Sequence, residues 1–244
     1  MLSSIKSSLF SSVTPAAFCI GTAMLIGGCS SSMQTRSAVT TSESRADMSP
    51  AAIYADLKAG NDRFVRGNTT TQNWLSQAKT TAAEGQFPKA IVLSCLDSRV
   101  IPEMVFDQGI GDIFVGRVAG NFENTDQLGS MEFGTAVAGS KVIVVLGHTA
   151  CGAVKGTIDQ AELGNLTEML TNIEPAVQQV SVGSMGRTSK DAGYVNKVVE
   201  ANVRQTVKDI SDRSPVLAGR VASGDLMIVG GVYDLGTGRV TWIK

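Results

Sequence analysis

The stretch that decides the fold is SKVIVVLGHTACGAV, residues 140–154. Its first part, residues 140–148, is an apolar run that predicts a central strand buried on both faces of a parallel sheet. His148, the only histidine in the chain, ends this run, and Cys151 follows three residues later. Because histidine and cysteine are both zinc ligands, the stretch supplies half of a possible metal site.

The segment KAIVLSCLDSRV, residues 89–100, supplies the other half. Its apolar part predicts a second buried strand that ends at Cys95. Asp97 and Arg99 follow at alternate positions, so in an extended backbone these side chains point the same way as Cys95. Ligands of parallel sheets bind beyond the carboxyl ends of the strands, where both segments place their polar residues.

Together the two segments offer two thiolates, one imidazole and one carboxylate. This donor set favours Zn²⁺. Three protein ligands leave a fourth position open for chemistry, whereas four ligands form a closed structural site. A disulfide between Cys95 and Cys151 is the alternative, because paired cysteines in an exported protein commonly form one.

The remaining pattern predicts an α/β fold with one catalytic domain over residues 49–244. Its sheet is mostly parallel, has four to five strands, is flanked by helices and is preceded by an N-terminal helical arm. The expected helices and strands are helices over 49–68, 72–84, 125–140 and 194–210, a strand over 112–120, and a hairpin formed by 225–234 and 238–243.

Composition limits the class of protein. The chain has 244 residues and a net charge of −1, so it has no electrostatic footprint for binding nucleic acid. A charged fraction of 18% and 26 glycines suit a tightly turned α/β protein better than a coiled coil or a disordered chain.

The N-terminus predicts export. Residues 1–28 form a mildly apolar segment typical of a signal peptide. Its end, LIGGC, resembles the lipobox of bacterial lipoproteins, which implies lipidation at Cys29. The polar residues 29–48 predict a flexible tether. This interpretation places the protein in a bacterial cell envelope, on the periplasmic side; an ordinary cleaved signal, with Cys29 incidental, is the alternative.

The two chemical motifs resemble those of the β-class carbonic anhydrases. CLDSR (95–99) is similar to their C-S/A-D-S-R, GHTACG (147–152) is similar to their G-H-x-x-C-G, and the likeness extends over about residues 50–244. The resemblance implies one zinc ion per chain on Cys95, His148 and Cys151. It also implies a catalytic dyad of Asp97 and Arg99, with Asp97 as a fourth ligand only in a closed state.

The resemblance further implies substrate-pocket positions at Gln86, Phe114, Ala119, Phe133 and Gly152. It implies a homodimer, or a dimer of dimers, with the active site at the interface and the arm around the partner. Two positions depart from the family pattern. Leu96 replaces a small residue and is expected to alter packing behind the metal. Val92 stands where an allosteric subgroup carries tryptophan, so the open form is favoured.

The implied activity is reversible hydration of carbon dioxide to bicarbonate. Hydrolysis of carbonyl sulfide or carbon disulfide, and non-enzymatic zinc binding by a surface lipoprotein, are the alternatives; an intact Asp97–Arg99 pair disfavours the latter. Because the only histidine is an expected ligand, no histidine remains to carry protons near pH 7. Turnover is therefore expected to depend on external buffer.

Overall fold

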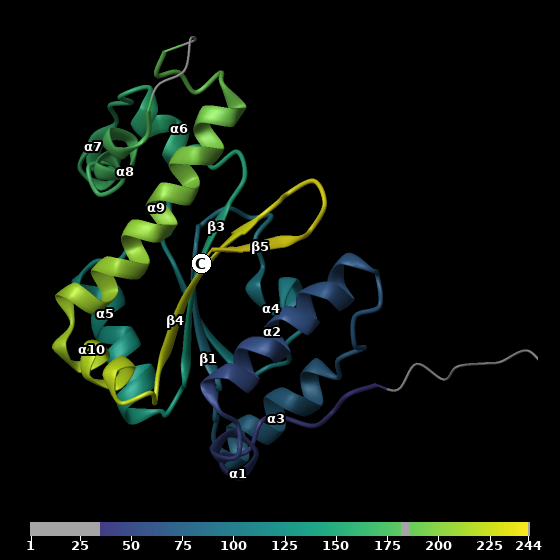
Figure 1. Cartoon of the computed structure of the whole chain (residues 1–244). Coiled ribbons are helices and arrows are strands. Elements are labelled where there is room, and N and C mark those ends of the chain that lie inside the picture. Colours follow the sequence, from purple (N-terminus) through teal and green to yellow (C-terminus); the bar gives the residue numbers. More distant parts are fainter. Residues whose placement is uncertain (1–34, 182–185, 244) are drawn as a thin grey trace, which may run out of the picture. The chain divides into compact units, whose positions relative to one another are not determined.

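A five-stranded sheet forms the centre of the protein (Figure 1). The computed structural model describes residues 35–181 and 186–243. The strands are β1 (Ala90–Ser94), β2 (Ile113–Arg117), β3 (Val142–His148), β4 (Met227–Tyr233) and β5 (Val240–Ile243). They lie in the order β2-β1-β3-β4-β5, with β5 antiparallel to β4 and all other pairs parallel. The predicted sheet and its C-terminal hairpin are confirmed.

Helices cover both faces of this sheet (Figure 1). The helices of the described residues are α1 (Ser42–Ala46), α2 (Pro50–Val65), α3 (Trp74–Glu84), α4 (Pro102–Val105), α5 (Thr125–Glu132), the π-helical turn η1 (Phe133–Val137), α6 (Gly152–Ile158), α7 (Gly164–Leu170), α8 (Glu174–Gln179), α9 (Ala192–Arg213) and α10 (Pro215–Ala222). Helices α2 and α4 pack on one face, and α9 and α10 pack on the other.

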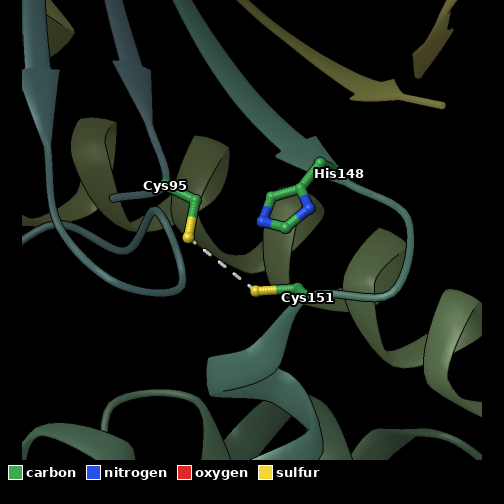
Figure 2. A group of neighbouring side chains, drawn as sticks. All are labelled: Cys95, His148 and Cys151. Atoms are coloured by element: carbon green, nitrogen blue, oxygen red, sulfur yellow. Dashed lines mark hydrogen bonds between the residues drawn. The ribbon is translucent and has the colours of Figure 1, made fainter. Parts of the chain in front are cut away.

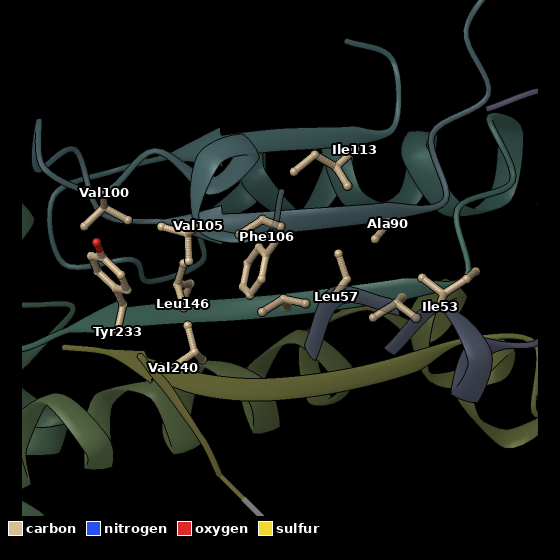
Figure 3. Packing of buried hydrophobic residues seen from close by; sticks show 13 residues of the cluster. Ile53, Leu57, Ala90, Val100, Val105, Phe106, Ile113, Leu146, Tyr233 and Val240 are labelled. Atoms are coloured by element: carbon tan, nitrogen blue, oxygen red, sulfur yellow. The ribbon is translucent and has the colours of Figure 1, made fainter. Parts of the chain in front are cut away.

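Side chains of the central strands alternate between two apolar layers. Ala90 of β1 and Leu146 of β3 lie in the same apolar layer as Leu57 of α2, on one side of the sheet (Figure 3). Leu93 of β1 faces the other side, where it packs in one cluster with Val203 of α9. Because both faces are buried, these strands are continuously apolar rather than alternating, as the sequence indicated.

The helix expected over 125–140 divides into two parts. It begins as α5 and continues as η1, whose hydrogen bonds follow the wider π pattern. Gly134 lies so close to the sheet that an added Cβ would stand 2.6 Å from the Ile91 side chain. Apolar periodicity predicts the helix, but it does not reveal the change in hydrogen bonding that this close contact accompanies.

Residues 35–48, ahead of the first long helix, are fixed to the body of the protein. Arg36 donates to the Asp112 carboxylate across 2.8 Å, and the Thr40 hydroxyl donates to the same carboxylate. Lys141 donates from Nζ to two backbone carbonyl oxygens near the end of this segment. These contacts join the segment to the amino end of the sheet.

The structure describes only part of the predicted N-terminal regions, namely residues 35–48 of the tether. The signal peptide over 1–28, Cys29 and residues 30–34 lie outside the described residues. The part of the expected tether over 35–48 differs from a free linker, because it contains α1 and the contacts above. Its polar composition gave no sign of the buried carboxylate that binds it. Among the helices in the described part of the chain, none is long and apolar enough to cross a bilayer.

Candidate metal centre

Three buried side chains meet beyond the carboxyl ends of the two central strands (Figure 2). Cys95 directly follows β1, His148 ends β3, and Cys151 lies at the start of α6. Their ligand atoms all lie within 4.8 Å of one another, and none of the three residues is more than 4% exposed. We call these three residues the metal cluster; the structure brings together the ligands that the sequence predicted.

The metal cluster fits zinc better than a disulfide. Both cysteines are free, and their sulfur atoms are 3.9 Å apart. A disulfide needs about 2.05 Å. Two thiolates on a tetrahedral zinc, each with a Zn–S bond of about 2.3 Å, would stand about 3.8 Å apart. The spacing of the sulfur atoms therefore matches a shared metal ion.

The ring of His148 is oriented for metal binding. Its Nδ1 lies 3.0 Å from the carbonyl oxygen of Thr149, so Nδ1 carries the hydrogen and Nε2 keeps its lone pair. Nε2 is buried and has no hydrogen-bond partner. Buried polar atoms normally have partners, and a metal ion would satisfy this one.

The two thiols are electrostatically coupled. The hydrogen bond with Cys151 lowers the pKa of the Cys95 thiol against the effect of burial, and the Gly120 N–H contributes in the same direction. The same contact, together with burial, raises the pKa of Cys151 well above its ordinary value. The contact between the two sulfur atoms uses a thiol hydrogen, and metal binding would release it because zinc binds thiolates.

A fixed carboxylate stands at the edge of the metal cluster. Arg99 donates from Nε to Oδ1 of Asp97 across 2.9 Å and from Nη2 to Oδ2 across 2.7 Å. These hydrogen bonds hold the pKa of the Asp97 carboxyl well below its usual range. Oδ2 is 3.8 Å from Nε2 of His148. The carboxylate thus stays ionised and paired beside the ligands, the arrangement expected for the open form.

Arg117 is a residue of this site that sequence reasoning missed. It ends β2, next to the carboxyl end of β1, and its Nε donates to the carbonyl oxygen of Cys95 across 3.0 Å. Its Nη2 donates to the carbonyl oxygen of Asp97. One side chain therefore fixes the backbone of both a ligand and the paired carboxylate. A charged residue at the end of an apolar strand was the available signal.

Comparison with known proteins identifies the family. The family model described as "Carbonic anhydrase" matches residues 90–240. Carbonic anhydrase 2 of Mycobacterium tuberculosis is 36% identical over 190 residues, covering 78% of this chain and 91% of that protein. The carbonic anhydrase of Mycolicibacterium smegmatis is 36% identical over 191 residues, covering 78% and 92%. The chain belongs to the carbonic anhydrase family.

Solved structures indicate the β class of carbonic anhydrases. The Coccomyxa β-carbonic anhydrase in complex with acetazolamide matches with a TM-score of 0.61 and 27% identity, covering 81% of this chain and 86% of that one. The β-carbonic anhydrase CcaA matches with a TM-score of 0.61 and 25% identity, covering 79% of this chain and 88% of that one. One chain from the crystal structures of two tetrameric β-carbonic anhydrases of Sordaria macrospora is 22% identical with a TM-score of 0.60, covering 79% of this chain and 94% of that one, and shows the same fold. The chain is therefore a lyase that hydrates carbon dioxide with zinc as its cofactor.

Three expected pocket residues of this carbonic anhydrase lie away from its own metal cluster. Phe114 and Phe133 line an open groove of about 820 Å³ along β2, and none of the three ligands lines it. Phe114 is in register with Ile91, four residues before Cys95, a separation of about 13 Å along a strand. Gln86 is exposed in the loop before β1. These side chains lie toward the amino end of the sheet, opposite the ligands.

The remaining expectations concern single positions near the cluster. Gly152 is exposed at the first position of α6, and an added Cβ there would meet nothing within 4 Å. Ala119 is half-buried just after β2. Leu96 was expected to alter packing behind the metal. This expectation is wrong, because the Leu96 side chain is exposed. An outward-pointing position tolerates a large residue, which the motif alone does not show. Val92 is fully buried in the core.

Proposed function

We propose that Asp97 and Arg99 form the catalytic pair of this carbonic anhydrase. The observation that carries the proposal is the position of the Asp97 carboxylate. It is bound by Arg99 through both oxygens, yet it stands 3.8 Å from the unpartnered Nε2 of His148. A structural ion pair has no reason to lie against an unsatisfied metal ligand.

Asp97 and Arg99 have separate chemical roles in this proposal. When bound, zinc supplies a Lewis acid that makes a water molecule acidic enough to react near neutral pH. Asp97 accepts a hydrogen bond from the reacting water and orients it toward carbon dioxide. Arg99 keeps that carboxylate ionised and fixed, because a bidentate guanidinium pair has a defined geometry. Arg99 is largely exposed, so the pair opens to solvent.

Stopped-flow hydration of carbon dioxide tests this role. We expect Asp97→Asn to keep about one zinc per chain and to lose roughly 10²- to 10⁴-fold in kcat. Asp212→Asn is the matched control, because Asp212 forms an exposed ion pair with Lys208 on α9. A variant Asp97→Asn that retains the wild-type rate with full zinc would contradict the proposal.

We also propose that the active unit is a homodimer joined along β2. This strand is at the edge of the sheet, so one side of its backbone is open to pairing with another strand. If two copies pair antiparallel there, the amino end of one β2 meets the carboxyl end of the other. Phe114, Phe133 and Gln86 of each copy then approach the metal cluster of its partner. The separation of these residues from their own cluster supports this arrangement.

An exposed side chain of the groove allows a test with little cost to folding. Phe133 is 57% exposed, and Phe133→Asp would place a charge in the proposed interface. We expect this variant to be monomeric by light scattering and to lose most of its activity while keeping its zinc. Leu163→Asp, on an apolar residue at the start of α7 that is 71% exposed, is the control. A fully active, dimeric Phe133→Asp would exclude this interface.

We further propose that Cys29 carries a lipid that holds the enzyme in a bacterial cell envelope, facing the periplasm. The support is the LIGGC sequence before Cys29 and the polar residues after it. Arg36 is already fixed to the body, so only a short stretch separates the anchor from the enzyme. We expect Cys29→Ser to lose incorporation of labelled fatty acid and to leave the membrane fraction. Equal labelling of the wild-type protein and of Cys29→Ser would contradict a lipid anchor at Cys29.

A further inference from the structure

A backbone N–H group points at the sulfur atom of Cys95, one of the three residues that would hold zinc. Gly120 follows the end of β2, and its N–H lies 3.3 Å from Sγ of Cys95. The residue has a φ of +87°, which is accessible to glycine at little cost. An added Cβ would come within 2.3 Å of the Ile173 side chain. Only glycine therefore fits at position 120. Because glycine has the greatest backbone freedom of any residue, a further contact is needed to fix the direction of its N–H.

Asn202 restrains this glycine from the other side. It is 2% exposed on α9, and its Nδ2 donates across 2.7 Å to the carbonyl oxygen of Gly120. The two residues are 82 positions apart in the sequence. The amide thus fixes the carbonyl of Gly120 while the N–H of the same residue faces Cys95.

Close packing of α9 on the sheet brings Asn202 within reach. Val203, the next residue, fills the space over two glycines: a Cβ on Gly147 would stand 2.6 Å from it, and a Cβ on Gly230 would stand 2.7 Å from it. Strands β3 and β4 therefore admit the helix more closely than strands with larger side chains would. Asn202 is consequently held by a rigid element rather than by a loop.

We propose that Asn202 is a positioning residue for the metal centre. It holds Gly120 so that its N–H stays directed at the sulfur of Cys95. A hydrogen bond to a thiolate withdraws negative charge from sulfur and fixes its direction, and outer-shell partners of this kind tune metal affinity. Because two thiolates give a zinc ion much negative charge, such a donor makes the metal a stronger Lewis acid. The proposal rests on zinc binding at the cluster and is independent of the role of Asp97.

The chain offers a matched control for a merely structural role. Asn61 is equally buried, at 3% exposed, and also holds backbone: its Nδ2 donates to the carbonyl oxygens of Val105 and Gly238, and its Oδ1 accepts from Val240. None of these residues belongs to the metal centre. Substituting Asn61 should therefore destabilise the fold without changing the metal.

The test uses the full chain and two readouts other than turnover. Zinc affinity is measured by competition with a chelator, and the thiolate-to-metal charge-transfer band is recorded after loading with cobalt(II). We expect Asn202→Ala to weaken zinc binding about 10- to 100-fold and to move the cobalt band to longer wavelength, because the sulfur becomes richer in electrons. Asn61→Ala should change neither, although it lowers the urea midpoint.

Asn202→Ser, which keeps a polar group but shortens its reach, serves if the alanine variant does not fold. Wild-type zinc affinity and an unmoved cobalt band in the folded Asn202 variant would overturn the proposal. So would equal changes in Asn61→Ala. Zinc binding by the wild-type chain tests the metal site itself, and the kinetics of Asp97→Asn test the catalytic pair. The failure of either of those proposals can therefore be told apart from the failure of the proposal for Asn202.

Discussion

Two buried polar clusters lie at opposite ends of the same sheet, and they differ in one respect. At the carboxyl end, His148 of the metal cluster leaves Nε2 without a partner. At the amino end, the fully buried Asp112 accepts hydrogen bonds from Arg36, Thr40 and the Gly109 N–H. We call this second group the Asp112 cluster. Asp112 and His148 are both fully buried, but only Asp112 has its polar atoms satisfied.

The difference separates a functional site from a structural one. A satisfied buried carboxylate fixes the position of the chain around it, and here it holds residues 35–48 against the body. An unsatisfied buried nitrogen destabilises the metal-free protein and is retained where a ligand compensates for it. Altering each cluster should therefore change different properties of the protein.

The largest effect is expected from removing a ligand. Cys151→Ala should abolish stoichiometric zinc binding and lower carbon dioxide hydration roughly 10³-fold or more, because the metal provides several kcal/mol of the barrier reduction. The free energy of unfolding of the metal-free protein should change by only about 1 kcal/mol, the cost of a small cavity. Zinc analysis, stopped-flow rates and urea titration measure the three quantities. A loss of stability in Cys151→Ala of about 3 kcal/mol, the value expected below for Asp112→Ala, would remove the contrast between the two clusters.

The Asp112 cluster should show the opposite behaviour. Asp112→Ala leaves Arg36, Thr40 and the Gly109 N–H without their acceptor, so we expect about 3 kcal/mol lower free energy of unfolding. Zinc content at saturating zinc and kcat in the folded protein should remain near wild type. Urea titration beside zinc analysis checks this. Loss of zinc from folded Asp112→Ala would mean that the two ends of the sheet are coupled.

A smaller effect concerns pH and sharpens the electrostatic part of the comparison. Arg99 lowers the pKa of Asp97, so the wild-type carboxylate stays ionised until the pH falls through that lowered value. In Arg99→Leu the pKa should return toward about 3.9. The acid limb of kcat/KM should therefore begin at higher pH, with a lower plateau because the carboxylate is no longer fixed. Identical acid limbs from pH 4 to 8 would show that Arg99 does not control this carboxylate.

The smallest effect comes from the absence of a second histidine. His148 is the only one in the sequence and is fully buried as a ligand, so it cannot carry protons to solvent. We expect kcat to rise severalfold as an imidazole-type buffer increases at constant ionic strength, whereas kcat/KM should stay constant. A rate independent of buffer over a wide range would require an internal proton carrier.

Much of this molecule could be predicted because its decisive signals are local. A run of apolar residues predicts a strand buried on both faces, and residues at the carboxyl ends of such strands converge. This logic located Cys95, His148 and Cys151, and the spacing of Asp97 and Arg99 predicted that their side chains point together. The structure brings the three ligands together and pairs Asp97 with Arg99, but residues 98 and 99 lie in a turn rather than in the extended segment that was expected.

Other features were missed because they depend on partners distant in sequence. Arg36 turns part of an apparently flexible tether into a fixed segment through Asp112, 76 residues later. The position of Leu96 on the outside follows from the path of one loop, which a motif does not describe. Gln86 and Phe133 share a family pattern with the ligands but lie at the other end of the chain's own sheet.

The sequence by itself determined the buried strands, the longer helices and the donor set of two thiols, an imidazole and a carboxylate that favours zinc, since these follow from residue type and short spacing. Only the tertiary structure decided which buried polar atoms are satisfied, how near α9 approaches the sheet, and that Asn202 reaches Gly120. These depend on packing between segments far apart in the chain, where a difference of one side chain's width makes or breaks a hydrogen bond.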